Sequence, residues 1–193
     1  MKIRKYSKKD EQGWLRCRVV SFLDSAYFDN VIQKKEIYEN PVIELIAEIN
    51  NQLVGLIDVE YENKIGNVGY KQDELTAVIW HLAVLPEFRK QGIATKLLRK
   101  ASSFLKQNNI KILQAWTRDD KFVLDWYKNR GFKKKESYYH VFTSGNECDK
   151  IAESKIKNLY ICNTFCHYLG NNSEKIKNEF ERIHECSLFE KEI

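Results

Sequence analysis

Residues 82–98 read LAVLPEFRKQGIATKLL, and this stretch changes character twice along its length. It continues an apolar run, passes through a basic turn that contains one glycine, and ends in a helical pattern. The apolar run at 75–85 lacks polar alternation, which predicts a central strand covered on both faces, and Pro86 ends it. Apolar residues at helical spacing then predict an amphipathic helix over 92–107. The stretch therefore predicts a strand, a tight turn and a helix in succession.

The turn between this strand and helix is typical of a phosphate-binding site. The first N–H groups of a helix have no intrahelical partner, and the helix dipole makes that end partly positive. Gly92 lets ligand oxygens approach the backbone, and Ala94 is also small. Arg89 and Lys90 add positive charge. A single glycine excludes a Walker A loop and a dinucleotide fingerprint, so the alternatives are another kind of phosphate cradle or a plain tight turn with solubilising charges.

The rest of the chain alternates strands and helices around this unit. Further strands are predicted at 2–6, 42–49, 53–61, 110–117, 137–142 and 184–193. Helices are predicted after Ser7, over 31–40 before Pro41, and from Asp119 or Asp120 to Arg130, where Gly131 ends the helix. The runs at 42–49 and 53–61 are separated by a short turn with two asparagines, which indicates an antiparallel hairpin. Together these elements predict one mixed sheet with helices.

Composition and charge narrow the class of protein. The chain has 193 residues, of which 43% are hydrophobic and 31% charged, as expected of one globular domain. It contains no apolar run long enough to cross a bilayer and no signal-peptide pattern, so we expect a cytoplasmic location and no membrane partner. The net charge of +5 is spread along the chain without a clustered basic stripe, which makes a nucleic-acid partner unlikely.

The cysteines predict reduced thiols and no metal. They stand at irregular spacing in a chain without an export signal, which favours buried free thiols at Cys17, Cys148, Cys162, Cys166 and Cys186. The alternative is a metal site, because His167 follows Cys166 and His184 precedes Cys186. Their spacing is not that of a zinc knuckle, so buried small side chains remain the expectation.

The stretch at 82–98 resembles the acetyl-CoA-binding signature of the GNAT superfamily of N-acetyltransferases. In that signature an apolar strand precedes Pro-Glu-aromatic-Arg and a turn with small residues at alternate positions, and Arg89, Gly92 and Ala94 stand at these places. A second landmark of the family, a Tyr shortly before Gly-Phe at a helix end, is matched by WYKNRGF with Tyr127. The resemblance covers about residues 1–143 and implies an α+β fold, with one mixed, mostly antiparallel sheet of about seven strands flanked by helices.

The resemblance implies acetyl-CoA as the acyl donor for direct transfer to a primary amine of a small molecule or a protein. The strand backbone at Leu82, Ala83 and Val84 would pair with the pantetheine arm, and an N–H there would polarise the thioester carbonyl. The pyrophosphate would lie against the backbone of the turn, at Arg89, Lys90, Gln91, Gly92, Ile93, Ala94 and Thr95. No metal is implied.

Two residues of the predicted helix at 119–130 receive roles from the same resemblance. Tyr127 would donate a proton to the departing thiolate, with a core aromatic as the alternative. Asp120 stands where the family often has an Asn, which implies a cofactor contact, with a helix N-cap as the alternative.

No general base can be named from the strand at 75–85. Alternation along a strand places Val78 and Trp80 on one face together with Leu82 and Val84. The positions where relatives often carry a base are therefore occupied by Val78 and Trp80. His81 is expected on the opposite face as a hydrogen-bonded core histidine.

Other candidates for the base lie elsewhere in the sequence. Asp58 and Glu60 share a face of the strand at 53–61, with exposed strand carboxylates as the alternative, and an ordered water is a further candidate. The missing base supports a second interpretation of the whole chain, a non-catalytic relative that binds coenzyme A and serves as a sensor or interaction module.

The acceptor side in the family is formed largely by the first helices. Here that segment contains Trp14, Arg16, Arg18 and Tyr27, which would suit a flat or anionic acceptor. We expect a single N-acetyltransferase domain over 1–193, with a core of about 1–143 and a final strand at about 184–193. Residues 144–182 would then be an insertion that covers the site or forms a homodimer contact, with a stabilising extension as the alternative.

Overall fold

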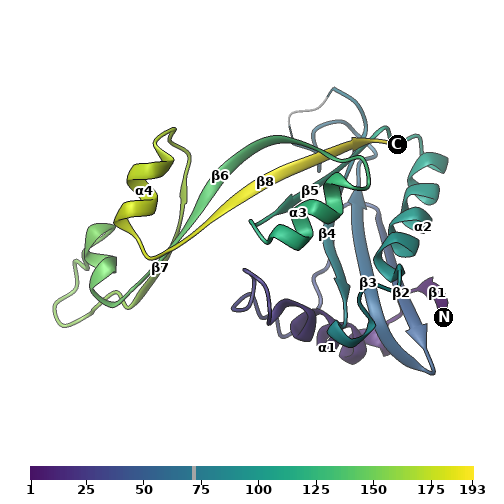
Figure 1. The fold of residues 1–193 in the computed structure, drawn as a ribbon, viewed down its shortest axis with the longest axis horizontal. Coiled ribbons are helices and arrows are strands. Elements are labelled where there is room, and N and C mark those ends of the chain that lie inside the picture. The colour runs from purple at the N-terminus through teal and green to yellow at the C-terminus, as the bar shows by residue number, and fades with distance from the viewer. Residues whose placement is uncertain (71–72) are drawn as a thin grey trace.

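The computed structural model describes residues 1–70 and 73–193, and one eight-stranded sheet organises the chain (Figure 1). The strands are β1 (Lys2–Lys5), β2 (Val42–Ile49), β3 (Gln52–Tyr61), β4 (Thr76–Val84), β5 (Ile112–Thr117), β6 (Lys133–Ser144), β7 (Asn163–Tyr168) and β8 (Arg182–Glu192). The α-helices are α1 (Glu11–Phe22), α2 (Ile93–Gln107), α3 (Lys121–Lys128) and α4 (Ser173–Glu179). Short 3-10 turns occur at η1 (Lys8–Asp10), η2 (Pro86–Phe88) and η3 (Gly145–Lys150).

The strand order is β1-β2-β3-β4-β5-β8-β6-β7. Neighbouring strands in the described residues run antiparallel except β4 and β5, which run parallel because α2 connects them. This is the predicted mixed, mostly antiparallel sheet flanked by helices. The strand beyond the expected seven is β7, which lies within the segment between β6 and β8.

The β2–β3 hairpin turns at Asn50 and Asn51. Both residues have left-handed backbone conformations, with φ of 49° and 61°. Two consecutive left-handed residues match the twist of the flanking strands, and asparagine tolerates this conformation better than most residues. The predicted antiparallel hairpin is confirmed.

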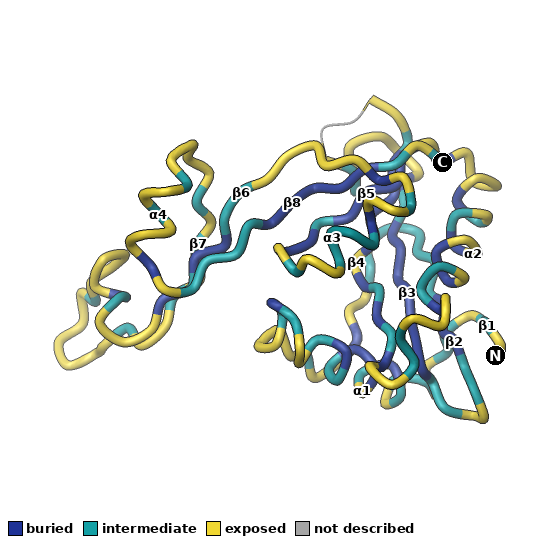
Figure 2. Tube along the Cα trace, viewed as in Figure 1, coloured by how far each residue is buried: buried dark blue, intermediate teal, exposed yellow. Residues whose placement is uncertain are grey.

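The first two helices cover opposite faces of the sheet. The indole of Trp14 on α1 donates to Asp58 on β3 at 3.4 Å, so Asp58 points toward α1. A Cβ added at Gly55 would lie 3.0 Å from the Ile93 side chain, so Gly55 points toward α2. Positions 55 and 58 have opposite parity along the strand, as two faces require. We call these the α1 face and the α2 face, and the deepest burial lies between them on β3 (Figure 2).

The predicted helix over 31–40 is absent, and that segment lies along the α1 face without regular structure. Lys35 and Tyr38 both contact Asp58, Glu36 contacts His81, and Asn40 contacts Glu60. A helix would turn some of these side chains away from the sheet, because only residues three or four apart share a helix face. The long-range contacts therefore outweigh the local helical pattern.

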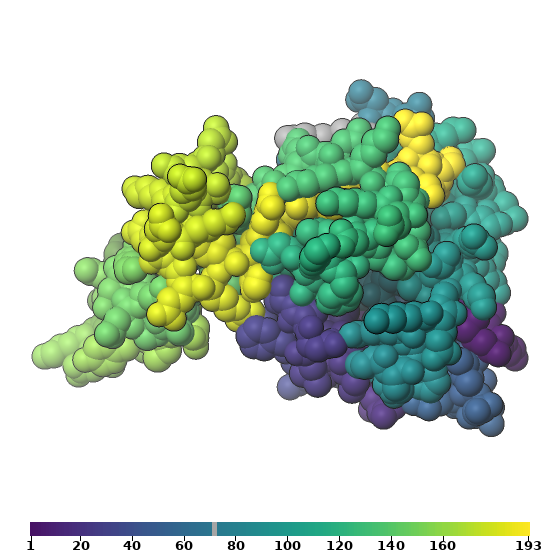
Figure 3. All heavy atoms as spheres, in the orientation of Figure 1, coloured from purple at the N-terminus to yellow at the C-terminus, as the bar shows by residue number. Residues whose placement is uncertain are grey.

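The outer parts of β6 and β8 carry an arm that projects from the body of the molecule (Figure 3). β8 pairs with both β5 and β6 from Ser187 to Glu190, whereas the residues of β8 before Ser187 pair with β6 alone. We define the arm as residues 138–186, which include η3, β7 and α4. Asp29 of the body accepts from Arg182 at 2.7 Å, and Asp119 contacts His184 at 2.9 Å. These two contacts hold the base of the arm against the body.

All five cysteines are free thiols. Cys17, Cys148 and Cys186 are buried as expected, but Cys162 is exposed and Cys166 only half-buried. The expectation of burial is wrong for these last two, because they belong to the arm, where little core covers β7. Within residues 1–70 and 73–193, no group of three or more ligating side chains is placed to hold a metal ion. In the same ranges, no helix has both the length and the apolar character of a membrane span.

Candidate functional site

The sheet opens between β4 and β5. Their pairing starts at Thr76 and Ile112 and ends at Ile79 and Ala115, so the later half of β4 has no β5 partner among the described residues. β5 instead continues along β8 as far as Thr117. The two parallel strands thus separate, and the edge of β4 that would face β5 has no strand partner along residues 80–84 among the described residues.

The backbone groups at this open edge belong to Leu82 and Val84. The N–H of Leu85 donates to the Val54 carbonyl on β3 at 3.0 Å. Backbone direction alternates along an antiparallel pair, so Ala83 also turns its polar groups toward β3. Leu82 and Val84 turn theirs toward the opening. The Val84 carbonyl accepts from the Arg89 Nε–H at 3.3 Å. The pairing of Leu82, Ala83 and Val84 with a pantetheine arm stays a prediction.

A β-bulge at Trp80 changes which side chains of β4 share a face. His81 pairs with Asp58 and Ile79 with Val59, so Trp80 is the extra residue between them. Its indole donates to Glu60 at 2.7 Å, which places it on the α1 face, the face that His81 also occupies. The prediction that Trp80 shares a face with Leu82 and Val84 is wrong, because simple alternation ends at a bulge.

The basic turn presents a row of unengaged backbone donors. None of the N–H groups of residues 90–95 donates to an acceptor within the described ranges, and the next residue, Lys96, is the first to bond back, to Gly92 at 3.0 Å. Lys90 and Gly92 both have positive φ, of 60° and 75°. A Cβ added at Gly92 would meet nothing within 4 Å, so open space lies over the turn. This is the geometry of an anion-binding concavity at a helix N-terminus.

Arg89 does not extend over this concavity. Its guanidinium donates to Asp24 at 2.6 and 3.0 Å and to the Ser21 carbonyl at 2.8 Å, and its own N–H bonds to Pro86 at 3.2 Å. The guanidinium and the N–H of Arg89 thus both have partners within the protein, and its contact with the pyrophosphate stays a prediction. Its side chain instead fastens the turn to the end of α1, which fixes the position of the donors that follow.

Arg130 is a residue of the site that sequence reasoning missed. Its guanidinium donates to the Thr95 hydroxyl at 3.1 and 2.9 Å and stacks on Trp126, with its central carbon 4.4 Å from the ring centroid. The contact joins the end of α3 to the first turn of α2. A positive charge thereby lies beside the concavity, and the only signal in the sequence was a basic residue directly before Gly131.

Tyr127 lies in an aromatic cluster and is 6% exposed. Its ring stacks on Phe189 with centroids 5.6 Å apart and meets Phe132 edge-on at 5.1 Å. No hydrogen bond of its hydroxyl is found within the described ranges. Burial raises the pKa of Tyr127, so the phenol keeps its proton at neutral pH.

Asp120 stands at the N-cap of α3 without making a side-chain cap. Both of its carboxylate oxygens instead accept from the Ala26 N–H, at 2.9 and 3.1 Å. Burial raises the pKa of this carboxyl, and the bond from Ala26 opposes that rise. Asp120 thus holds the segment after α1 against α3 and makes no side-chain cap, and its cofactor contact stays a prediction.

The four predicted acceptor residues do not form a common surface. Trp14 is fully buried in the core, and Arg16 is exposed on α1. Arg18 is buried and donates to His81 at 3.2 Å and to the Asn30 carbonyl at 2.7 Å. The Tyr27 hydroxyl accepts from the Arg118 N–H at 3.1 Å. The structure does not bring these four side chains together on one exposed surface, and their role toward a flat or anionic acceptor stays a prediction.

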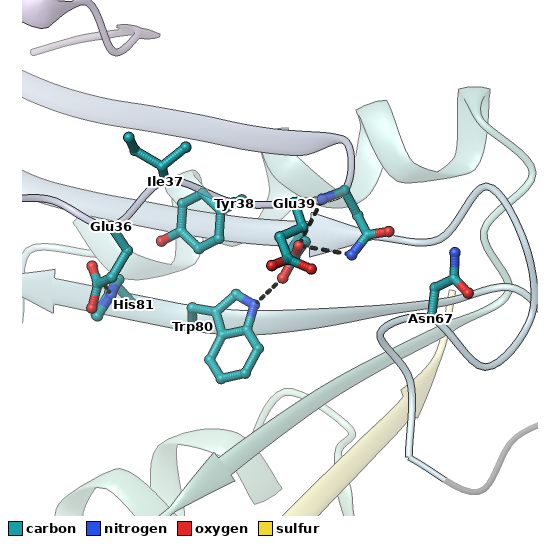
Figure 4. Close-up of a pocket in the computed structure, with 9 residues that line it drawn as sticks. Glu36, Ile37, Tyr38, Glu39, Asn67, Trp80 and His81 are labelled. Carbon is teal, nitrogen blue, oxygen red and sulfur yellow. Dashed lines mark hydrogen bonds and ion pairs between the residues drawn. The ribbon is translucent and has the colours of Figure 1, made fainter.

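A pocket of about 380 Å³ opens on the α1 face beside the bulge (Figure 4). Figure 4 shows Glu36 and His81 at one end, Asn67 at the other, and the Trp80 ring between them. The residues that line it are Glu36, Ile37, Tyr38, Glu39, Asn40, Glu60, Asn67, Trp80 and His81. Trp80 and His81 directly precede Leu82 of the open edge, so the pocket adjoins that edge from the opposite face to α2.

His81 is buried and fully hydrogen-bonded, as expected of a core histidine, but its partners are charged. Arg18 can only donate, so the Nδ1 atom of His81 accepts, and Nε2 carries the proton toward Glu36 at 3.0 Å. Burial raises the pKa of Glu36, but the bond from His81 and the charge of Arg18 outweigh this and lower it to about 2. His81 has no free nitrogen to act as a base.

Asp58 and Glu60, the candidate bases on β3, are both buried, which contradicts the alternative of exposed strand carboxylates. Asp58 is bound by Lys35 at 2.8 Å and by the Tyr38 hydroxyl at 2.9 Å. Glu60 accepts from Trp80 at 2.7 Å and from the Asn40 N–H at 2.9 Å, and it lines the pocket. Glu60 is therefore the candidate base that borders the pocket, whereas Asp58 is not part of the pocket lining.

Comparison with known proteins finds similarity to one family of acetyltransferases. Residues 10–132, more than half of the chain, match the model of the Acetyltransferase (GNAT) family. An uncharacterised N-acetyltransferase of Methanocaldococcus jannaschii is 32% identical over 92 residues, which are 47% of this chain and 39% of that protein. N-alpha-acetyltransferase 30 of Schizosaccharomyces pombe is 21% identical over 132 residues, 68% of this chain and 84% of that protein.

The fold is also shared with solved structures. The PaiA N-acetyltransferase of Thermoplasma acidophilum, solved in complex with coenzyme A, superposes with a TM-score of 0.59 at 14% identity. The superposition covers 100% of this chain and 98% of that one. At this identity the likeness concerns the fold alone, and it extends over the arm as well as the body.

Proposed function

Because the chain belongs to the Acetyltransferase (GNAT) family, we propose that it transfers the acetyl group of acetyl-CoA directly to a primary amine. The observation that carries the proposal is the row of unengaged N–H groups at residues 90–95, next to the open edge of β4. The row would bind the pyrophosphate, and Leu82 and Val84 would pair with the pantetheine arm. No metal takes part in this proposal.

The reaction then occurs where the open edge meets the pocket. The amine nitrogen attacks the thioester carbon, a C–N bond forms, and the C–S bond breaks. The carbonyl oxygen gains charge during attack, and an N–H of the open edge would stabilise it. The sulfur leaves as a thiolate, and the proton lost by the nitrogen ends on that sulfur or in water.

Tyr127 would assist departure of the sulfur. Burial raises the pKa of Tyr127 above the ordinary value of about 10, whereas the pKa of a free thiol is about 8.5. Complete proton transfer from the phenol to the thiolate is therefore uphill. A hydrogen bond from the phenol to the developing thiolate is favoured, since it needs no exchange of the proton.

Tyr127→Phe is expected to lower kcat about a hundredfold, because one donor to developing negative charge is lost. The Kd for acetyl-CoA should change less than about threefold, since the ring and its stacking on Phe189 remain. Stopped assays of thiol release measure kcat, and calorimetry measures the Kd for acetyl-CoA. Tyr160→Phe, at an exposed position of the arm, is the control. An unchanged kcat in Tyr127→Phe would remove the residue from the mechanism.

The proposed function is tested by calorimetric titration of acetyl-CoA, followed by amine-dependent thiol release with a panel of primary amines. Binding with release supports the enzyme. Binding without release for any amine would favour the alternative, a non-catalytic module that binds coenzyme A. Absence of binding would overturn both.

A cytoplasmic location, a homodimer and the division into one domain with an insertion at 144–182 remain predictions from the sequence. The arm carries exposed apolar side chains, among them Ile156, Tyr160 and Leu169. These would suit a contact with a second copy. Sedimentation of the purified protein measures its oligomeric state.

A further inference from the structure

We propose that the pocket on the α1 face selects an acceptor that carries at least one positive charge besides the reacting amine. This inference rests on the proposed function and names its substrate class. The chemistry is that of an amine with a second ammonium or guanidinium, supplied by a small polyamine or by a basic peptide.

Glu60 is a buried carboxylate that lacks a cation. It is 7% exposed, and its partners are the Trp80 indole, the Asn40 N–H and the Asn40 side-chain amide, all neutral donors. No ion pair of Glu60 exists within residues 1–70 and 73–193. A buried charge is stable when it is paired with an opposite charge. A cation in the pocket would supply this counter-charge to Glu60.

Two more carboxylates lie around the same space. Glu39 is exposed and makes no hydrogen bond or ion pair to any described residue. Glu36 stays ionised at neutral pH because its pKa is about 2, although Arg18 and His81 already offset part of its charge. Among the residues that the structure describes, no Lys or Arg side chain lines the pocket. The pocket is therefore a site of net negative charge in a chain whose overall net charge is +5.

The apolar surface of the pocket fits the same ligand. Trp80 is 52% exposed, and its ring forms the wall between the two ends of the pocket (Figure 4). Indole rings bind methylene chains by apolar contact and ammonium groups by cation–π attraction. A bare carboxylate cluster would bind any cation, whereas carboxylates around an indole favour an organic one.

The position of Glu60 sets the spacing of the two charges. Glu60 lies opposite Val78, and Leu82 of the open edge lies opposite Ile57, three residues from Glu60 along β3, because Trp80 is the extra residue of the bulge. That separation is about 10 Å along the strand. A reacting nitrogen near Leu82 and a second charge near Glu60 are thus joined by a chain of several methylenes, a length that a pocket of about 380 Å³ accommodates.

The test compares matched acceptors on the wild type and on Glu39→Gln. One pair is a linear diamine and the monoamine of the same chain length, and the second is a peptide with a basic or a neutral second residue. At low salt, kcat/KM for each dication should exceed that of its matched monocation about tenfold. Glu39→Gln should lower kcat/KM about three- to fivefold for the dications only, through KM. Glu153→Gln, at an exposed position of the arm, is the charge-matched control.

Equal rates for the matched acceptors, or an equal effect of Glu39→Gln on both, would overturn the inference. If the kcat/KM preference for the dication is larger in the diamine pair, the acceptor is a small polyamine. If that preference is larger in the peptide pair, the acceptor is a protein. Calorimetry of the diamine with the protein and coenzyme A separates this inference from the proposed function. Diamine binding that exceeds monoamine binding in the absence of turnover would contradict the enzyme and retain the charge-selective pocket.

Discussion

Gly92→Glu is expected to reduce acetyl-CoA affinity at least a hundredfold, to the limit of calorimetric detection. The new side chain would project into the open space over the turn, where a Cβ meets nothing within 4 Å. Its carboxylate would repel the phosphates at close range, and a non-glycine residue at a φ of 75° adds about 1–2 kcal/mol of local strain.

The control for this variant is Gly145→Glu. Gly145 also has a positive φ, of 54°, and open space around its Cβ position, but it lies in η3 of the arm. The two variants share the strain and the added charge, and differ only in location. Equal affinity in both would show that the turn at 88–95 does not hold the cofactor.

Lys35→Met is expected to lower the free energy of unfolding by about 3–5 kcal/mol. The Lys35 ammonium lies 2.5 Å from Glu44 and 2.8 Å from Asp58, and only 4% of its side chain is exposed. Burial lowers its pKa, but these carboxylates outweigh burial and raise it, so the group remains charged. The variant would leave Asp58, itself fully buried, without its counter-charge.

The electrostatic part of this stability loss can be distinguished from the part due to lost packing contacts. Methionine keeps most of the contacts with the surrounding rings, so the loss is mainly electrostatic. Adding Asp58→Asn to Lys35→Met should recover part of the stability, because the unpaired buried charge is removed. Lys34→Met, at the exposed neighbouring position, should change stability by less than about 0.5 kcal/mol. Urea denaturation measures all three, and an equal loss in Lys34→Met would contradict the explanation.

The sequence was sufficient where local chemistry decides the structure. The strand, turn and helix at 82–98 follow from an apolar run, a proline and a glycine in the order that the structure adopts. The hairpin follows from Asn50 and Asn51, whose side chains tolerate left-handed backbone. These features depend on residues adjacent in the chain, so no tertiary information was needed.

The sequence was insufficient where distant residues decide. The segment at 31–40 has a weak helical pattern, but Lys35 and Asn40 make their contacts with β2 and β3. The bulge at Trp80 has no marker in the sequence, and one extra residue is enough to reverse the expected faces of β4. The pocket carboxylates Glu39 and Glu60 are far apart in the chain and meet only because the sheet and the preceding segment bring them together.

The opening between β4 and β5 links the stability of the folded chain to the binding of a ligand at that edge. An unpaired strand edge inside a sheet lacks the hydrogen bonds that its neighbours have, and a cofactor that pairs with Leu82 and Val84 would supply them as a substitute strand. Free cofactor at a hundred times its Kd would then add about 2.7 kcal/mol to the stability of the folded chain. A bound cofactor would thus also protect the folded chain from proteolysis that acts through its unfolded form.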